Sequence, residues 1–336
     1  RTIAHTGGQH AEACHFMLTG YPQVPDVNAE PVGSVIHPCY GSVVSEQLSW
    51  RNNLPPFVQL SAGNIKYHHA GFLGSGYDPL RIKSDPNAAD FEIEDVSIPS
   101  SVGADRTQRR RSMLAELDRF HRLADQTAGA IAERNEFYNQ AYDLITSPAA
   151  KQAFRIEQEP ADLRDRYGRF REGQAALLSR RLVEAGVRFI TVEFNGYDTH
   201  DKNFIELETP LLPKLDQAYS ALLEDLAERG LLETTLVICM GEFGRTPKVN
   251  GLAGRDHYPA VNSICFSGGG MKMDGFVHGQ TDDKCAQVVG SADSTHDLAA
   301  TIYSALGVAS NKVYHNIDGR PILTTDNGHP VREMFV

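Results

Sequence analysis

The second half of the chain alternates unbroken apolar runs with segments of helical periodicity. The apolar runs at residues 187–194, 235–240 and 263–267 predict strands, and residues 211–226 and 298–306 predict amphipathic helices. Strands without polar alternation are typical of a parallel sheet that helices cover on both faces. This order of elements therefore predicts an α/β fold with a mostly parallel central sheet.

The first half is richer in turn residues, and we expect it to be dominated by loops around a short strand at residues 57–60. From residue 105 to 147, apolar side chains recur at three- and four-residue spacing, which predicts a helix. A second helix is expected over residues 161–185, because Gly186 then supplies a C-terminal cap.

The composition is that of a folded, acidic protein. Among the 336 residues, 43 Asp and Glu against 32 Lys and Arg give a formal net charge of −11. Nucleic-acid binding depends on clustered Lys and Arg, so we expect no nucleic-acid partner, and the short basic run at 109–111 is predicted to form a solvated helix face. No apolar stretch approaches the roughly 18 residues of a membrane span. The length suits one large α/β domain or two domains of roughly 150 residues each. Of these we expect a single domain over residues 1–336, with a helical segment at about 105–186.

The five cysteines show no CxxC spacing, so neither a disulfide framework nor a structural zinc site is predicted. Cys239 and Cys265 lie in apolar strand-like runs. We therefore predict that both are core residues.

Side chains with metal-ligand chemistry follow the predicted strands, at the edge where α/β sheets bind ligands. Imidazole nitrogens and carboxylate oxygens bind divalent cations, and there are enough of them here for two ions. Two such ions can hold the attacking and leaving oxygens of a phosphoryl or sulfuryl transfer, and Arg245 would bind the remaining oxygens. The candidate metal ligands are Asp198, His200, Glu242, Asp256, His257 and His296.

Each of these clusters also has a purely structural interpretation. The segment 198–200 has residues that favour a helix N-cap, and Glu242 could simply pair with Arg245. Residues 256–257 could form a turn, and residues 296–297 a helix cap. Four such clusters at one sheet edge are hard to explain separately, so a metal or anion site is the favoured interpretation.

The N-terminal region offers candidate anion contacts. A helix predicted to begin near Gln9 would direct the free N–H groups around residues 6–10 toward an anion. His15 is expected on the surface and His5 in a loop. A further candidate substrate pocket for an anion consists of Lys66, His68 and His69.

The chain resembles a bacterial family, domain of unknown function 1501, in motifs spread over nearly its whole length: HAEACHFMLTGYP, GFLGSGYDPLRI, NGYDTH, GEFGRTP, GRDHYP and HDLAATIYSALGV. That family is abundant in planctomycetes and is grouped as a sulfatase-like branch of the alkaline phosphatase superfamily. The resemblance implies a three-layer α/β/α sandwich with two metals for phosphate and sulfate ester hydrolysis. On this pattern one metal is held by Asp198, His200 and His296, and the second by Glu242 and His257, with Asp256.

Two features differ from the superfamily pattern. Formylglycine sulfatases carry a Cys where this chain has His10, and their CxPxR motif is absent, so a formylglycine sulfatase is not expected. Superfamily phosphatases use Ser or Thr as nucleophile. Thr6 is the nearest candidate here, and His10 is a candidate ligand, acid or anion contact. Thr6 and His10, together with Arg245 from the strand-end cluster, are therefore the candidate catalytic residues.

Members of the family that this chain resembles usually begin with a twin-arginine export signal, followed by a first strand that ends near an Asp that resembles a metal ligand of the superfamily. On that pattern we expect an exported, periplasmic or cell-envelope protein whose first strand and one ligand precede Arg1. The expected activity is metal-dependent hydrolysis of a small-molecule or saccharide ester of phosphate or sulfate. A homo-oligomer or association with another chain is left open. The alternatives are a catalytically silent binding or assembly protein and a phosphomutase or transferase.

Overall fold

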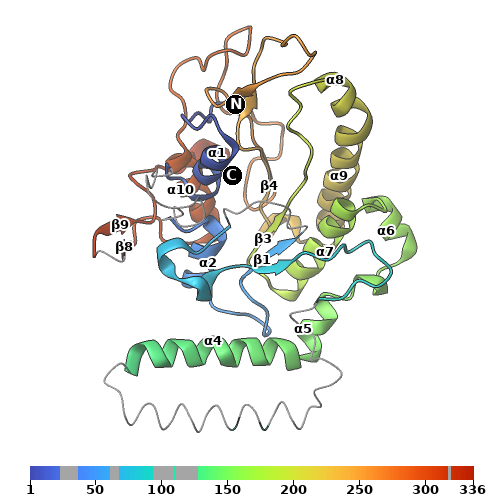
Figure 1. Cartoon of the computed structure of the whole chain (residues 1–336), viewed down its shortest axis with the longest axis vertical. Coiled ribbons are helices and arrows are strands. Elements are labelled where there is room, and N and C mark those ends of the chain that lie inside the picture. The colour runs from blue at the N-terminus through green and yellow to red at the C-terminus, as the bar shows by residue number, and fades with distance from the viewer. Residues whose placement is uncertain (23–36, 61–67, 94–108, 110–111, 113–127, 317–318) are drawn as a thin grey trace.

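A computed structural model describes residues 1–22, 37–60, 68–93, 109, 112, 128–316 and 319–336 (Figure 1). Three parallel strands form a sheet in the order β2-β1-β3, with Val58 paired to Leu80 on one side and to Ile190 on the other. The strands are β1 Phe57–Leu60, β2 Leu80–Ile82 and β3 Phe189–Val192. The strand predicted at 57–60 is confirmed, and the one predicted at 187–194 is shorter than expected.

Helices pack against both faces of this sheet. The main ones are α1 His10–Thr19, α2 Tyr40–Gln47, α6 Ala161–Tyr167, α7 Arg171–Ala185, α9 Leu212–Glu228 and α10 Thr295–Leu306. Val58 shares a core with α7 and α9. Phe57 points to the opposite face, because successive strand residues alternate, and its ring meets α2 at Gly41 so closely that a Cβ there would lie 2.6 Å from it. The fold is a mixed helix–strand fold around a parallel sheet, compatible with the predicted α/β class.

The helix predicted over residues 161–185 is two helices. Gly168 separates α6 from α7 and has a φ of 92°, which a glycine adopts without a Cβ clash. The apolar periodicity continues across this break, so periodicity alone does not reveal it. The predicted end at Gly186 is confirmed, since that residue caps α7 with a φ of 106°.

Helical structure in the first half differs from the expectation of loops. The helix α2 was not predicted, because five consecutive residues at its start are buried and it lacks the polar face that produces a helical pattern. Within the helix predicted at 105–147, the described residues 109 and 112 are helical, and α4 spans Ala128–Thr146 at the edge of the molecule in Figure 1. The helix α5 Pro148–Ala153 follows it. Arg109 is exposed as expected, whereas residues 110–111 lie outside the described part.

The remaining strands form two-stranded antiparallel ladders. They pair β4 Val237–Cys239 with β7 Cys265–Ser267, β5 Gly244–Arg245 with β6 His257–Tyr258, and β8 Val313–His315 with β9 Pro321–Leu323. The strands predicted at 235–240 and 263–267 are therefore present, but their mutual pairing is antiparallel, because an apolar run does not determine strand direction. Cys239 is half-buried and Cys265 is exposed, so the prediction that both are core residues was wrong for Cys265.

The predicted helices at 211–226 and 298–306 are confirmed as α9 and α10. The short elements are α8 Asn203–Glu206, a π-helical turn at Leu207–Leu211, and 3-10 turns at Gly71–Leu73, Ser75–Tyr77, Ile156–Gln158, Leu232–Thr234 and Arg332–Met334. Across the described ranges, every helix is too short or too polar to cross a membrane.

Candidate functional site

Loops from distant parts of the chain meet at the N-terminal end of α1. His10 is the first residue of that helix, Asp198 lies in the loop after β3, and the pairing of β5 with β6 sets Arg245 directly opposite His257. Of the residues predicted from the sequence, the structure brings together His10, Asp198, His200, Glu242, Arg245, Asp256 and His257.

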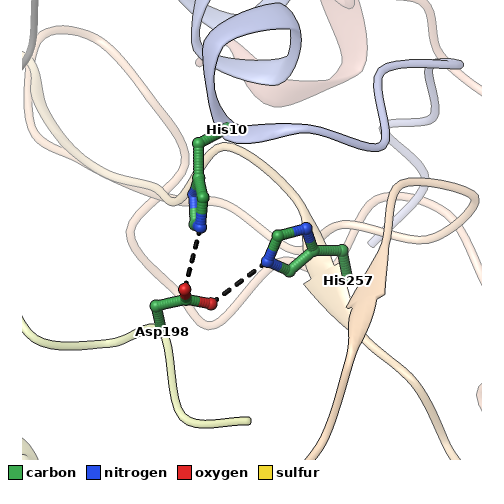
Figure 2. Close-up of side chains that lie close together, drawn as sticks. All are labelled: His10, Asp198 and His257. Atoms are coloured by element: carbon green, nitrogen blue, oxygen red, sulfur yellow. Dashed lines mark hydrogen bonds and ion pairs between the residues drawn. The ribbon is translucent and has the colours of Figure 1, made fainter.

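The carboxylate of Asp198 is the centre of this group. Its Oδ2 lies 2.9 Å from His10 Nε2, and its Oδ1 lies 3.1 Å from His257 Nε2. Figure 2 draws both contacts as dashed lines. The same Oδ1 lies 3.0 Å from His200 Nε2 and accepts a hydrogen bond of 2.7 Å from Arg245. The Arg245 guanidinium also donates to two backbone carbonyls, which fix its position. Three imidazoles therefore converge on one carboxylate.

Each of the three imidazoles is oriented by a hydrogen bond from its other ring nitrogen. Carboxylates and carbonyls only accept hydrogen bonds, so each Nδ1 donates. Each Nε2 also faces an acceptor, the Asp198 carboxylate, so a second proton or a cation has to lie between the two atoms. Outer partners of this kind fix the tautomer and ring orientation of metal-binding histidines in proteins. The Nδ1 groups donate from His10 to Glu242 at 2.7 Å, from His200 to Asp256 at 2.8 Å and from His257 to the Gly8 carbonyl at 2.8 Å.

The spacing of the inner atoms suits a cation. The Nε2 atoms of His200 and His257 lie 2.9 Å apart, and two ring nitrogens at that distance require a hydrogen or a cation between them. With Asp198 Oδ1 they form a triangle whose edges are 2.9, 3.0 and 3.1 Å. Three ligands at right angles around an ion, with bonds of about 2.1 Å, are about 3.0 Å apart. The ligand atoms of His10, Asp198 and His257 also lie within 4.8 Å of one another.

The electrostatics couple the acidic and basic groups tightly. Burial alone would raise the pKa of Asp198, but hydrogen bonds from Arg245, His10 and His257 lower it well below its usual range. Burial also opposes protonation of His10, yet its hydrogen bonds to Glu242 and Asp198 outweigh burial and raise its pKa. A proton on His10 therefore stabilises the two carboxylates, and a cation bound by Nε2 would take the place of that proton.

Phe243 and His5 support the site and were not predicted from the sequence. Phe243 stacks on the His257 ring, with centroids 4.1 Å apart, and contacts the His10 ring at 5.3 Å. His5 donates through Nε2 to the Glu242 carbonyl at 2.7 Å. The only sequence signal for Phe243 was its place between Glu242 and Arg245 in the GEFGRTP motif, and for His5 there was none beyond its loop position.

Gly254 is a third supporting residue that sequence reasoning missed. A Cβ at this position would lie 1.7 Å from the His200 carbonyl oxygen, so the loop that carries Asp256 rests directly on the backbone of the loop that carries His200. The glycine that precedes Arg255 in the GRDHYP motif was the available signal.

His296 lies elsewhere in the fold. Its ring packs edge-on against Tyr21, with centroids 5.1 Å apart, and the next residue, Asp297, belongs to the capping box that begins α10. The capping interpretation of residues 296–297 therefore holds for Asp297. His15 is fully buried, so its predicted surface position was wrong, because Tyr21 and His37 cover that side of α1.

The expected substrate pocket is described only in part, since Lys66 lies outside the described residues. His68 is buried, and burial lowers its pKa to about 3, so it brings no positive charge to an anion at neutral pH. Its Nδ1 lies 3.8 Å from Glu193 Oε1. His69 Nδ1 lies 3.8 Å from Asp78 Oδ1.

Two of the purely structural interpretations of the strand-end residues are wrong. Residues 198–200 do not cap a helix, because α8 begins only at Asn203 with Lys202 as its N-cap. Arg245 pairs with Asp198, not with Glu242. Thr6 is exposed in the loop that precedes α1.

Residues 1–335 match the model of one protein family, described as Protein of unknown function (DUF1501). Neither a curated protein nor a solved structure matches the chain. The family match covers all of the residues that form the site. It assigns no activity to them.

Proposed function

The chain belongs to the DUF1501 family of proteins of unknown function, and on that premise we propose that it is a metal-dependent hydrolase of phosphate or sulfate esters. One observation carries the proposal: three imidazole Nε2 atoms converge on the Asp198 carboxylate while each Nδ1 is anchored to an acceptor. Carbohydrate esters are among the candidate substrates.

The donor set fits a divalent cation. Imidazole nitrogen and carboxylate oxygen together suit zinc, manganese and similar ions, whereas thiolates, which favour softer ions, are absent from the described group. We propose His10, Asp198, His200 and His257 as the ligands, with Glu242 and Asp256 orienting two of the imidazoles. The second ion and the roles of Glu242, Asp256 and His296 as ligands remain predictions from the resemblance.

The residues around Asp198 would divide the chemistry between them. A divalent cation held there would act as a Lewis acid on the phosphoryl or sulfuryl oxygens. Arg245 lies within hydrogen-bond distance of Asp198 and has a geometry that suits bidentate contact with an oxyanion. His10 lies at the positive end of α1, where a helix favours negative charge, so a transferred anion would be stabilised from that side.

We also propose a more specific fold and location for the protein. We propose that the fold is the three-layer sandwich of the sulfatase-like branch of the alkaline phosphatase superfamily, and that the protein is exported to the periplasm or cell envelope. The parallel sheet with helices on both faces is in keeping with that architecture. The planctomycete-type origin rests on the motifs alone.

Activity against panels of phosphate and sulfate esters tests the proposal. The purified chain is assayed after chelation and again after addition of Zn²⁺, Mn²⁺, Mg²⁺ or Ca²⁺. We expect hydrolysis that chelation removes and one of these ions restores. The variant Asp198→Asn should be inactive, whereas Asp201→Asn, an exposed carboxylate of the same loop, should retain activity. Hydrolysis that is unaffected by chelation or by Asp198→Asn would contradict the proposal.

A second candidate is a catalytically silent binding protein. The observation that favours it is that Arg245 and three imidazoles already occupy the Asp198 carboxylate with mutual hydrogen bonds. That arrangement can stabilise the loops without any reaction. A protein that binds the metal but hydrolyses none of the esters would favour this alternative.

A further inference from the structure

Two cysteines face each other across the antiparallel ladder of β4 and β7. The register sets Cys239 directly opposite Cys265, in the last pair along β4. Residues directly opposite in such a ladder share one face of the sheet. Ser267, two residues from Cys265 and therefore on the same face, lies 3.0 Å from the Tyr219 hydroxyl of α9. Both thiols thus lie on the side of the ladder that faces α9.

The backbone separation of this pair suits a disulfide. Opposed residues of an antiparallel ladder have Cα atoms about 4.5 or 5.5 Å apart, depending on the hydrogen-bonding position. Disulfides span Cα separations of about 4.4–6.8 Å, so both positions are within range. The pair ends a short ladder, and β4 stops at Cys239. A small backbone adjustment at this end of the ladder would bring the two sulfurs within bonding distance.

The two thiols differ in accessibility. Cys265 is exposed and can meet a reagent in solution, whereas Cys239 is half-buried. Burial raises the pKa of Cys239, and the neighbouring Cys265 raises it further, which places the two sulfurs within electrostatic range of each other. Cys265 is therefore the residue that attacks first.

We propose that Cys239 and Cys265 are a redox-active pair that forms a reversible disulfide by exchange with a small-molecule disulfide. The Cys265 thiolate attacks one sulfur of the reagent, forms a mixed disulfide and releases one small thiol. The Cys239 thiolate then attacks the Cys265 sulfur and releases the second small thiol. One disulfide of the reagent is reduced, one protein disulfide is formed, and the two thiol protons remain on the released thiols.

The location of this pair links it to the candidate site. The disulfide would close a loop of residues 240–264, which contains Glu242, Arg245, Asp256 and His257. These residues lie around Asp198 whether or not the metal proposal is correct. Oxidation would therefore cross-link the base of the loop that supplies most of the site, and it should raise the midpoint of thermal unfolding.

Oxidised glutathione is the probe that tests the pair. The reduced full-length chain is incubated with it, free thiols are counted under denaturing conditions, and the peptides are mapped by mass spectrometry. Of the five free cysteines, two should be lost, with the loss of two hydrogens from the protein mass and a cross-linked peptide joining residues 239 and 265. Dithiothreitol should restore all five thiols.

Two variants keep the test specific. Cys265→Ser should abolish the cross-link, whereas Cys285→Ser, which removes the other exposed cysteine, should leave it intact. A glutathione adduct that persists on Cys265 in the unmodified chain would overturn the proposal, because it shows that Cys239 does not complete the exchange. Unchanged thiols at both positions, or a cross-link between other cysteines, would overturn it as well.

Discussion

A methyl group at Gly254 should disturb the site through the backbone. The Cβ of Gly254→Ala would lie 1.7 Å from the carbonyl oxygen of His200, 2.0 Å from its carbonyl carbon and 2.6 Å from the nitrogen of Asp201. All three atoms belong to the backbone, so no side-chain rotation can relieve the clash. Gly254 does not have a positive φ, so a left-handed backbone is not what disfavours alanine here, and the clash with the neighbouring backbone carries the argument.

The size of the effect follows from the distance that must open. Contacts of a Cβ below 3.0 Å are essentially absent from proteins, so the two loops must separate by more than 1 Å at this point. Overpacking of this kind typically costs about 1–3 kcal/mol of unfolding free energy. The same movement pulls His200 away from Asp256, to which its Nδ1 donates at 2.8 Å. Loss of such an outer partner weakens metal binding by about 10–100-fold.

Gly251→Ala is the matched control, because a Cβ there meets nothing within 4 Å in the same loop. Unfolding in urea gives the stability of both variants, and competition with a chromogenic chelator gives their Zn²⁺ affinity. We expect Gly254→Ala alone to lose stability and affinity. Equal unfolding midpoints for the two variants would refute the steric argument, and equal Zn²⁺ affinities would refute the link between this contact and the site.

Two further predictions concern buried charge and pH. Arg180, 1% exposed, forms ion pairs with the buried Asp225 at 2.8 Å and with Glu184. Urea denaturation of Arg180→Met should therefore show an unfolding free energy lower by about 3–5 kcal/mol. Glu184 is more exposed, so Glu184→Gln should lower the unfolding free energy by less than about 1 kcal/mol. Burial lowers the pKa of His37 from 6.5 to about 4. As the pH falls from 6.5 to 4, the His37 side chain of the unfolded protein therefore takes up a proton while that of the folded protein does not. The free energy of unfolding should fall over this pH range by up to about 3 kcal/mol. The same pH series on His37→Asn should give a shallower slope, and an identical slope would contradict the assignment to His37.

Local rules account for what the sequence predicted correctly. Glycines with positive φ end α7 at Gly186 and α10 at Gly307, and both ends can be recognised from a few neighbouring residues. Apolar runs located β3 and β4, but their pattern contains no information on which strand pairs with which. The antiparallel partner of β4 is therefore beyond a local pattern.

The arrangement within the site depends on contacts between residues far apart in the chain. Residue types and their places after strands identified Asp198 and His257 as candidates. They did not show which side chains face the centre of the site and which ones hold those side chains from behind. His10 contacts Glu242, 232 residues away, and Asp198, 188 residues away, and no spacing rule connects such positions. The burial of His15 has a more local origin, since Tyr21, which covers it together with His37, follows it closely along the chain.

The metal content of the purified chain tests the central claim most directly. The protein is equilibrated with excess Zn²⁺ or Mn²⁺, dialysed and analysed by inductively coupled plasma mass spectrometry, alongside Asp198→Asn and the control Asp201→Asn. The convergence of His10, His200 and His257 on Asp198 predicts at least one ion per chain in the unmodified protein and in the control, and none at this site in Asp198→Asn. An unmodified chain without bound metal, or an Asp198→Asn variant with the full metal content, would contradict the account.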